Sequence, residues 1–243
     1  MKQFRLVSSA IVSTLLFSSV AFAHVSFKDE LMAVSPEFYN WTGFYAGLNA
    51  GIVNHTMNIT DNSAASFLAT IQQVSNPRFT GGLQLGYRRQ IDFTKVSGVY
   101  GVEGSVDFSD AQFSKEYGSP FALYQLSSEN ELKTVCLLEF LGGIAADRTL
   151  FFMTAGLSWV NISGTTTNLD TIAFFNGFSV AQKELGTAIG GGIEYAFTDK
   201  LSARLKIDVI TPNTYTTNDN VGNSYLISNS IVQSTLGINY KFA

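Results

Sequence analysis

The stretch "LSARLKIDVI", residues 201–210, decides the fold class of this chain. Its apolar residues are Leu201, Ala203, Leu205, Ile207 and Val209, and between them stand Ser202, Arg204, Lys206 and Asp208. A period of two predicts a β-strand, because successive side chains of a strand point to opposite faces. A strand of a soluble sandwich buries its apolar face in a core, whereas a membrane-barrel strand turns that face to lipid. This stretch is compatible with both, so the rest of the chain must discriminate between them.

The amino terminus indicates export. Lys2 and Arg5 precede an apolar run over residues 6–22, and "AFA" at residues 21–23 has the small-x-small form of a signal peptidase site. We therefore predict a secretory signal peptide over 1–23, a periplasmic N-terminal segment over 24–41 and a barrel domain over 42–243. A retained membrane helix is the alternative, but the apolar run is short and carries a cleavage site.

Composition and charge disfavour several functional classes. The formal net charge is −4, and cleavage of the signal peptide with Lys2 and Arg5 takes it to −6, so we expect no nucleic-acid partner. Cys136 is the only cysteine, which precludes an intramolecular disulfide. We expect no cofactor and no metal, since histidines and cysteines do not cluster. His55 is expected in an exposed loop, and no Ser/His/acid set can be placed on facing strand rims, so we expect no enzymatic activity.

The alternating pattern recurs along the chain. Seven further segments show it: 43–53, 79–89, 98–108, 134–145, 150–160, 185–197 and 231–242. Eight segments of about ten residues match the length a tilted strand needs to cross a bilayer, and an even number suits a closed antiparallel barrel. The stretch "SAASFLATIQQV", residues 63–74, is the one candidate for a short helix.

The connections between these segments sort by length. Those at 92–97, 146–149 and 198–200 are short, and those at 54–78, 109–133, 161–184 and 211–230 are long. Short turns on one rim and long loops on the other are typical of outer-membrane barrels. The sequence therefore predicts an all-β protein, an eight-stranded antiparallel up-and-down transmembrane β-barrel with short periplasmic turns and four long extracellular loops. The apolar spots at 121–126 and 172–178 either extend strands above the membrane or form a contact patch.

Aromatic residues gather near the ends of the predicted strands on the outward face. They are Phe44, Tyr87, Tyr100, Trp159, Tyr195, Phe197, Tyr240 and Phe242. Such rings suit the headgroup level of a bilayer. The alternative is that they are core aromatics of a soluble β-protein, which the export signal and the sorted loops disfavour.

Three stretches resemble a known family: "NWTGFYAGLNAG" (40–51), "GGIEYAFTDKLSARLKID" (191–208) and "TLGINYKFA" (235–243). They are similar to the small outer-membrane β-barrels, which group opacity-type and OmpA-like barrels with surface antigens of Gram-negative bacteria. The resemblance implies an eight-stranded barrel with both termini in the periplasm. It also implies that the terminal aromatics, Tyr240 and Phe242, serve as the signal for the barrel assembly machinery. Relatives often place Arg at the lumen-facing positions where this chain has Glu139 and Leu141.

The inward positions of the strands carry charges of both signs. They are Arg88, Glu103, Asp107, Glu139, Glu194, Arg204, Lys206, Asp208 and Lys241. An eight-stranded barrel is just wide enough for side chains to fill it, and unpaired charges in a low dielectric are costly. We therefore predict a salt-bridged plug, with a narrow ion path lined by the same residues as the alternative.

The predicted function is that of an outer-membrane surface protein of a Gram-negative bacterium, exported through the secretory pathway. Its role is structural, surface-antigen or adhesin-like, and the alternative is a small-solute porin. The expected partners are outer-membrane lipid, the barrel assembly machinery and host surface molecules.

Overall fold

A computed structural model describes residues 39–61, 71–74, 77–93, 96–118, 125–168, 178–218 and 224–242. These residues belong to the second of two compact units, which spans Pro36–Ala243. The predicted signal peptide at 1–23 and most of the predicted periplasmic segment at 24–41 lie outside the described residues. Within the described part of the chain, no helix is long and apolar enough to cross a membrane.

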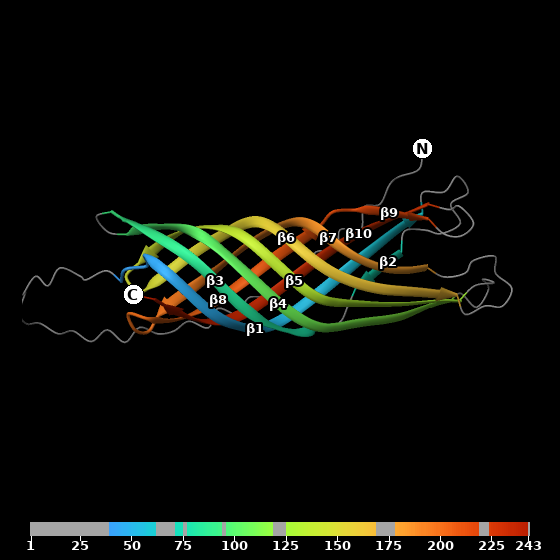
Figure 1. Cartoon of the computed structure of the whole chain (residues 1–243), viewed down its shortest axis with the longest axis horizontal. Helices are drawn as coiled ribbons and strands as arrows, with labels where there is room; N and C mark the ends of the chain where they lie inside the picture. The colour runs from blue at the N-terminus through green and yellow to red at the C-terminus, as the bar shows by residue number, and fades with distance from the viewer. Residues whose placement is uncertain are drawn as a thin grey trace, which may run out of the picture. The chain divides into compact units, whose positions relative to one another are not determined.

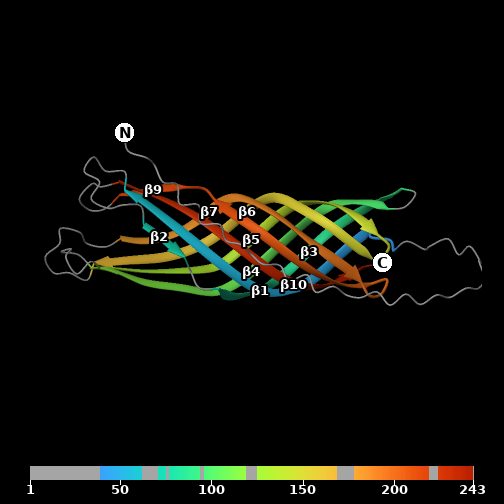
Figure 2. The ribbon, with the colours of Figure 1, turned by 180° about the vertical axis from the view of Figure 1, so that it is seen from behind.

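Antiparallel strands form one closed sheet (Figure 1). The strands are β1 (Gly43–Asp61), β2 (Ile71–Val74), β3 (Arg78–Asp92), β4 (Ser97–Gly118), β5 (Gln125–Ala146), β6 (Thr149–Asn168), β7 (Phe178–Ala196), β8 (Leu201–Pro212), β9 (Tyr215–Asn218) and β10 (Ser224–Lys241). Neighbours pair in the order β2-β1-β3-β4-β5-β6-β7-β8-β10-β9, and β1 also pairs with β10. The eight long strands therefore close into a barrel, which confirms the predicted up-and-down topology. Seen from behind, the same strands cross the barrel wall obliquely (Figure 2).

The strands run farther toward the long-loop end than the sequence pattern predicted. β4 continues to Gly118 rather than 108, and it pairs with β5 as far as Gly118↔Gln125. The predicted long connections are correspondingly shorter, and β2 and β9 lie inside two of them. The helix proposed at 63–74 is wrong for residues 71–74, which form β2, while 63–70 lie outside the described residues. Apolar alternation stops where the lipid contact stops, but backbone hydrogen bonding between strands does not depend on it.

The three short connections match the prediction. β3 and β4 are joined by residues 93–96, and β5 and β6 by Asp147 and Arg148. Asp147 has φ of 51°, a left-handed conformation that Asp tolerates better than most residues. In the turn between β7 and β8, the Thr198 hydroxyl accepts a hydrogen bond from the Leu201 amide at 2.9 Å. All three turns lie at one end of the barrel, because up-and-down strands return to the same rim at every second connection.

The two faces of the barrel wall have inverted polarity. Apolar side chains point outward and are exposed, among them Phe140 at 74% and Met153 at 70%, whereas Glu103 is 1% exposed on the inner face. β5, the least regular of the predicted strands, follows the same rule, with Leu138 and Ile144 also exposed. A soluble protein of this length would bury such side chains, so the outer band fits contact with lipid.

The aromatic residues predicted to form a belt lie on this outer face. All eight are exposed: Phe44, Tyr87, Tyr100, Trp159, Tyr195, Phe197, Tyr240 and Phe242. Some of their rings are in contact, with centroids 4.8 Å apart for the tilted pair of Phe44 and Tyr87. Exposure on this scale excludes the alternative that they form the core of a soluble β-protein.

Candidate functional site

Side chains fill the lumen in successive zones. The first is an apolar group near the short turns, here called the lower cluster: Tyr39, Trp41, Val99, Leu141, Ala145, Leu150, Phe152 and Ala196. A second apolar group, the upper cluster, lies toward the long loops: Val53, Leu132, Val135, Leu137, Val160, Ile162, Ala188, Ile210 and Ile231. The charged residues lie between them. On β5, for example, Glu139 is flanked by Leu137 of the upper cluster and Leu141 of the lower cluster.

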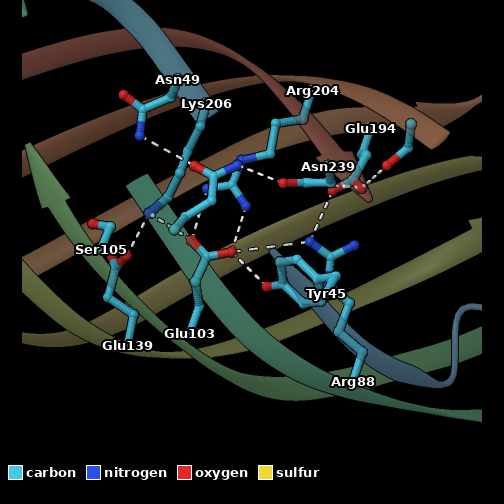
Figure 3. A network of polar contacts seen from close by, with 12 residues as sticks. Tyr45, Asn49, Arg88, Glu103, Ser105, Glu139, Glu194, Arg204, Lys206 and Asn239 are labelled. Carbon is cyan, nitrogen blue, oxygen red and sulfur yellow. Dashed lines mark hydrogen bonds and ion pairs between the residues drawn. The ribbon is translucent and has the colours of Figure 1, made fainter. Parts of the chain in front are cut away.

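Glu103 on β4 is the centre of the charged zone (Figure 3). The Arg204 guanidinium, on β8, donates to both of its oxygens, with 2.7 Å from Nη2 to Oε1. This two-pronged geometry is the strongest form of a carboxylate–arginine pair. The Tyr45 hydroxyl donates to Glu103 Oε2 at 2.5 Å. Because β4 and β8 lie on different sides of the barrel, the pair ties the walls together across the lumen.

Arg88 and Glu194 form a second pair on the side of the short turns. Arg88 Nη2 lies 2.8 Å from Glu194 Oε2, and the guanidinium stacks over the Tyr45 ring at 3.9 Å. Ser202 and Asn239 both donate to Glu194 Oε1, at 2.5 and 3.0 Å. The carboxylate is thus held by three strands, which leaves its charge paired and its lone pairs satisfied.

Lys206 joins the acids on the side of the upper cluster. Its Nζ donates to Glu139 and lies 3.0 Å from Asp208 Oδ1 and 3.8 Å from Glu103 Oε1. The contact with Asp208 is an ion pair. Asp107 forms no ion pair with the residues that the structure describes, and Ser105 Oγ lies 3.4 Å from its Oδ2. The acids therefore outnumber the cations in this part of the lumen.

The structure brings together eight of the nine charged residues proposed from the sequence. Arg88, Glu103, Asp107, Glu139, Glu194, Arg204, Lys206 and Asp208 are all buried inside the barrel. Three cations against five acids leave a formal charge of −2. Lys241 lies apart from them, half-buried at the short-turn end, where its Nζ donates to the Asn40 carbonyl. The described residues contain no group of three His, Cys, Asp or Glu side chains placed to hold a metal ion.

Glycines make room for this packing. A Cβ at Gly190 would lie 2.0 Å from Asp208 Oδ1 and 2.7 Å from Thr154 Oγ1. A Cβ at Gly86 would lie 2.4 Å from the Tyr45 hydroxyl. Gly190 therefore allows the close approach of the network side chains. A Cβ at Gly192 would instead lie 2.1 Å from the Leu205 carbonyl oxygen, so that glycine makes room for the neighbouring strand.

Tyr39 and Trp41, ahead of β1, close the short-turn end of the lumen. They are 6% and 3% exposed, and their rings meet edge to face at 4.6 Å. The Trp41 amide donates to Gln90 Oε1 at 2.8 Å, and Lys241 Nζ lies 4.4 Å from the Tyr39 ring centre. Burial, with Glu194 nearby, raises the pKa of Tyr39 to about 12. This closure was not predicted from the sequence, although residues 39 and 41 continue the inward parity of Tyr45.

A polar group lies beyond the upper cluster, above the outer apolar band. His55 Nε2 lies 3.0 Å from Asn229 Oδ1, and Asn229 Nδ2 lies 3.1 Å from Glu184 Oε2. His55 is 2% exposed, so the expectation of an exposed loop histidine is wrong. The reason is that β1 continues past the lipid band and keeps its inward parity. Burial lowers the pKa of His55 and raises the pKa of Glu184.

Sequence comparison gives a match over most of the chain. The family described as outer membrane protein beta-barrel domain matches residues 12–242. A curated relative is the 31 kDa outer-membrane immunogenic protein of Brucella melitensis. It is 25% identical over 219 residues, which cover 86% of this chain and 87% of the relative.

Solved structures of outer-membrane proteins resemble the barrel. OprG of Pseudomonas aeruginosa aligns with a TM-score of 0.48 and 14% identity, covering 85% of this chain and 99% of that protein. Ail, the attachment invasion locus protein of Yersinia pestis, aligns with a TM-score of 0.38 and 11% identity, covering 83% of this chain and 99% of Ail. At these identities the likeness concerns the fold.

Proposed function

Because the chain belongs to the outer membrane protein β-barrel domain family, we propose that it is a non-enzymatic surface protein with a plugged lumen. It resides in the bacterial outer membrane, and its proposed role is structural, surface-antigen or adhesin-like. The observation that carries the proposal is the buried charge network held between two apolar clusters. A lumen filled in this way leaves function to the parts of the chain at the cell surface.

The packing of the lumen supports a plug rather than a pore. A solute path requires water, yet Leu132, Val160 and Ile210 of the upper cluster have 0% exposure. Opposite charges on β4 and β8 lie in direct contact, so opening a path would separate buried ion pairs at high cost. A small-solute porin remains the second candidate, and the excess of acids would make such a pore select cations.

The extension of the strands supports a role at the surface. β4 continues for ten residues beyond Phe108 to Gly118, and Phe108 is its last position at which the structure describes an exposed apolar side chain. At a rise of about 3.3 Å per residue, this adds about 33 Å along the strand. Regions above a rigid scaffold usually carry the contacts of exported barrels. The Brucella relative is named an immunogenic protein, which accords with a surface antigen. Host surface molecules are the proposed partners.

The positions of the described cysteine and histidine do not favour catalysis. Cys136, the lone thiol, lies on the outward side of β5, away from the lumen. His55, the one histidine among the described residues, is buried next to Asn229. A nucleophile and a base within hydrogen-bond reach are the first requirement of covalent catalysis. These placements support the proposal that the protein is not an enzyme.

The carboxyl-terminal strand supports a proposed assembly signal. Tyr240 and Phe242 are outward and exposed, and their rings meet at 5.5 Å. The Phe242 amide donates to the Phe44 carbonyl at 2.8 Å, so the pair adjoins the seam where β10 meets β1. We propose that this edge is read by the barrel assembly machinery before the seam closes, after removal of a signal peptide over 1–23.

Conductance in planar lipid bilayers tests the plugged lumen. The refolded chain 24–243 is expected to show no steady channels at low voltage. Surface labelling of intact cells tests the proposed surface role, because the loops are expected to be accessible without permeabilisation. Steady, sizeable, cation-selective channels would replace the plug with the porin alternative.

A further inference from the structure

We propose that the outer face of β5, β6 and β7 carries a binding site for the phosphorylated headgroup of an outer-leaflet lipid. The headgroup site consists of Lys133, Thr134, Asn161 and Lys183. It lies on the wall of the barrel, not in the lumen, and no part of the charge network contributes to it. The inference rests on the placement in the outer membrane and goes beyond the proposed surface role.

Strand register brings the four residues into one row. Thr134 pairs with Asn161, and Asn161 pairs with Lys183, so the row crosses three adjacent strands. A register shift between Leu132 and Thr134 inserts Lys133 as an extra residue. Such a bulge re-aims a side chain. Leu132 and Val135 on either side are buried in the upper cluster, while the Lys133 side chain is 51% exposed, so the bulge turns its ammonium outward.

The row lies directly above the lipid-contacting band. The next outward row toward the short turns is Cys136, Trp159 and Leu185, which pair across the same three strands. Trp159 and Leu185 are 52% and 56% exposed on the outer face. An exposed tryptophan at the edge of an apolar band marks the level of the lipid headgroups. The headgroup site therefore occupies the height at which lipid phosphates lie.

The chemistry of the row suits a phosphate. Two ammonium groups flank an amide and a hydroxyl, and all four side chains can donate hydrogen bonds. With strands about 4.8 Å apart, the backbones of Lys133 and Lys183 lie about 10 Å apart, a span that two lysine side chains can close around one anion. Lys133 Nζ already lies 3.4 Å from Glu131, but both partners are exposed and such pairs are weak in water.

The site is confined to one side of the barrel. At the corresponding level of the β1–β10 seam, the outward residues are Asn54, Thr56, Ser228 and Ser230, all uncharged. Among the side chains that the structure describes, the outward lysines of the long-loop half are Lys133 and Lys183, and the exposed Arg78 of β3 has the inward parity of Thr80. A general attraction to anionic membranes would not need this asymmetry, whereas a specific lipid contact would produce it.

Native mass spectrometry of the detergent-purified full chain tests the proposal. The probes are lipid A with its phosphates and lipid A from which the phosphates have been removed. The wild-type barrel is expected to retain the phosphorylated form and to lose it about fivefold for each lysine replaced, in K133A, K183A and the double variant. The K133R/K183R variant is expected to keep binding. K200A, an exposed lysine in the β7–β8 turn at the opposite end, is the matched control and is expected to bind like the wild type.

Folding of each variant is checked by the change in gel mobility on boiling, so that a loss of lipid is not confused with a loss of structure. Equal binding of both lipid A forms, or unchanged binding in the folded K133A/K183A variant, would overturn the proposal. Binding of inorganic phosphate alone with an affinity equal to that of phosphorylated lipid A would assign the site to free phosphate and would also overturn the proposal.

Discussion

Replacing Glu103 or Arg204 singly is expected to destabilise the barrel far more than replacing both. Glu103 and Arg204 are 1% and 4% exposed, and the arginine donates to both carboxylate oxygens. Glu103→Leu leaves the guanidinium without its acceptors, and Arg204→Met leaves the carboxylate without its two-pronged donor. In the double variant both charges are gone, and the formal charge of the lumen stays at −2.

The expected magnitudes follow from the burial of the pair. Removing one partner of a buried ion pair costs about 3–5 kcal/mol, whereas replacing both by apolar groups is often nearly neutral. The double variant is still expected to lose about 1–3 kcal/mol, because the Tyr45 hydroxyl loses its acceptor. The two single losses sum to about 6–10 kcal/mol, so the coupling free energy is expected to be at least about 3 kcal/mol.

Urea unfolding in lipid vesicles, followed by tryptophan fluorescence, measures these free energies. With a slope of about 1–3 kcal/mol/M, a loss of 3 kcal/mol shifts the midpoint by about 1–3 M. The matched control is the pair Arg148–Asp199, which is 3.2 Å long but exposed, and whose coupling is expected below about 1 kcal/mol. Single losses below about 1 kcal/mol, or a coupling no larger than that of the control, would refute the view that the network holds the walls together.

Three further predictions concern the wall, the close contacts and the pH dependence. Leu205→Lys, on the lipid face, is expected to lower the free energy of unfolding by about 2–4 kcal/mol and to block assembly. Ser202→Lys is expected to lower it less, because the lumen is acidic. Equal gel shifts for the two variants would contradict the assigned faces. Gly190→Ala is expected to lose about 1–3 kcal/mol through overpacking, while Gly142→Ala, with nothing within 4 Å of its Cβ, should change unfolding by less than about 1 kcal/mol. Because the pKa of His55 is lowered in the folded barrel, the unfolded chain takes up the proton first as the pH falls. The free energy of unfolding should therefore decrease as the pH drops below 6.5, the usual pKa of histidine. His55→Gln should flatten this pH dependence in urea titrations between about pH 5 and 8.

The fold could be predicted from the sequence because polar and apolar residues alternate with a period of two along the strands of a membrane barrel. In each strand, residues of one parity face lipid and residues of the other parity face the lumen. This alternation predicted the buried charges on β8 without any tertiary information. The same signal fails where lipid ends. Above Ile52 the outward residues of β1 become polar, so the continuation to Asp61 and the burial of His55 were not predicted.

The parity of each strand and the sorting of short and long connections can be read from the residue pattern alone, and together they predict the closed barrel. Which charges meet depends on barrel closure, because partners such as Glu103 and Arg204 stand 101 positions apart in the chain. The position of Lys241 apart from the network, and the closure of the short-turn end by Tyr39 and Trp41, likewise become visible only in the folded barrel. Parity assigns a side chain to a face, whereas the height and the neighbours of that side chain depend on how eight tilted strands are registered around the lumen.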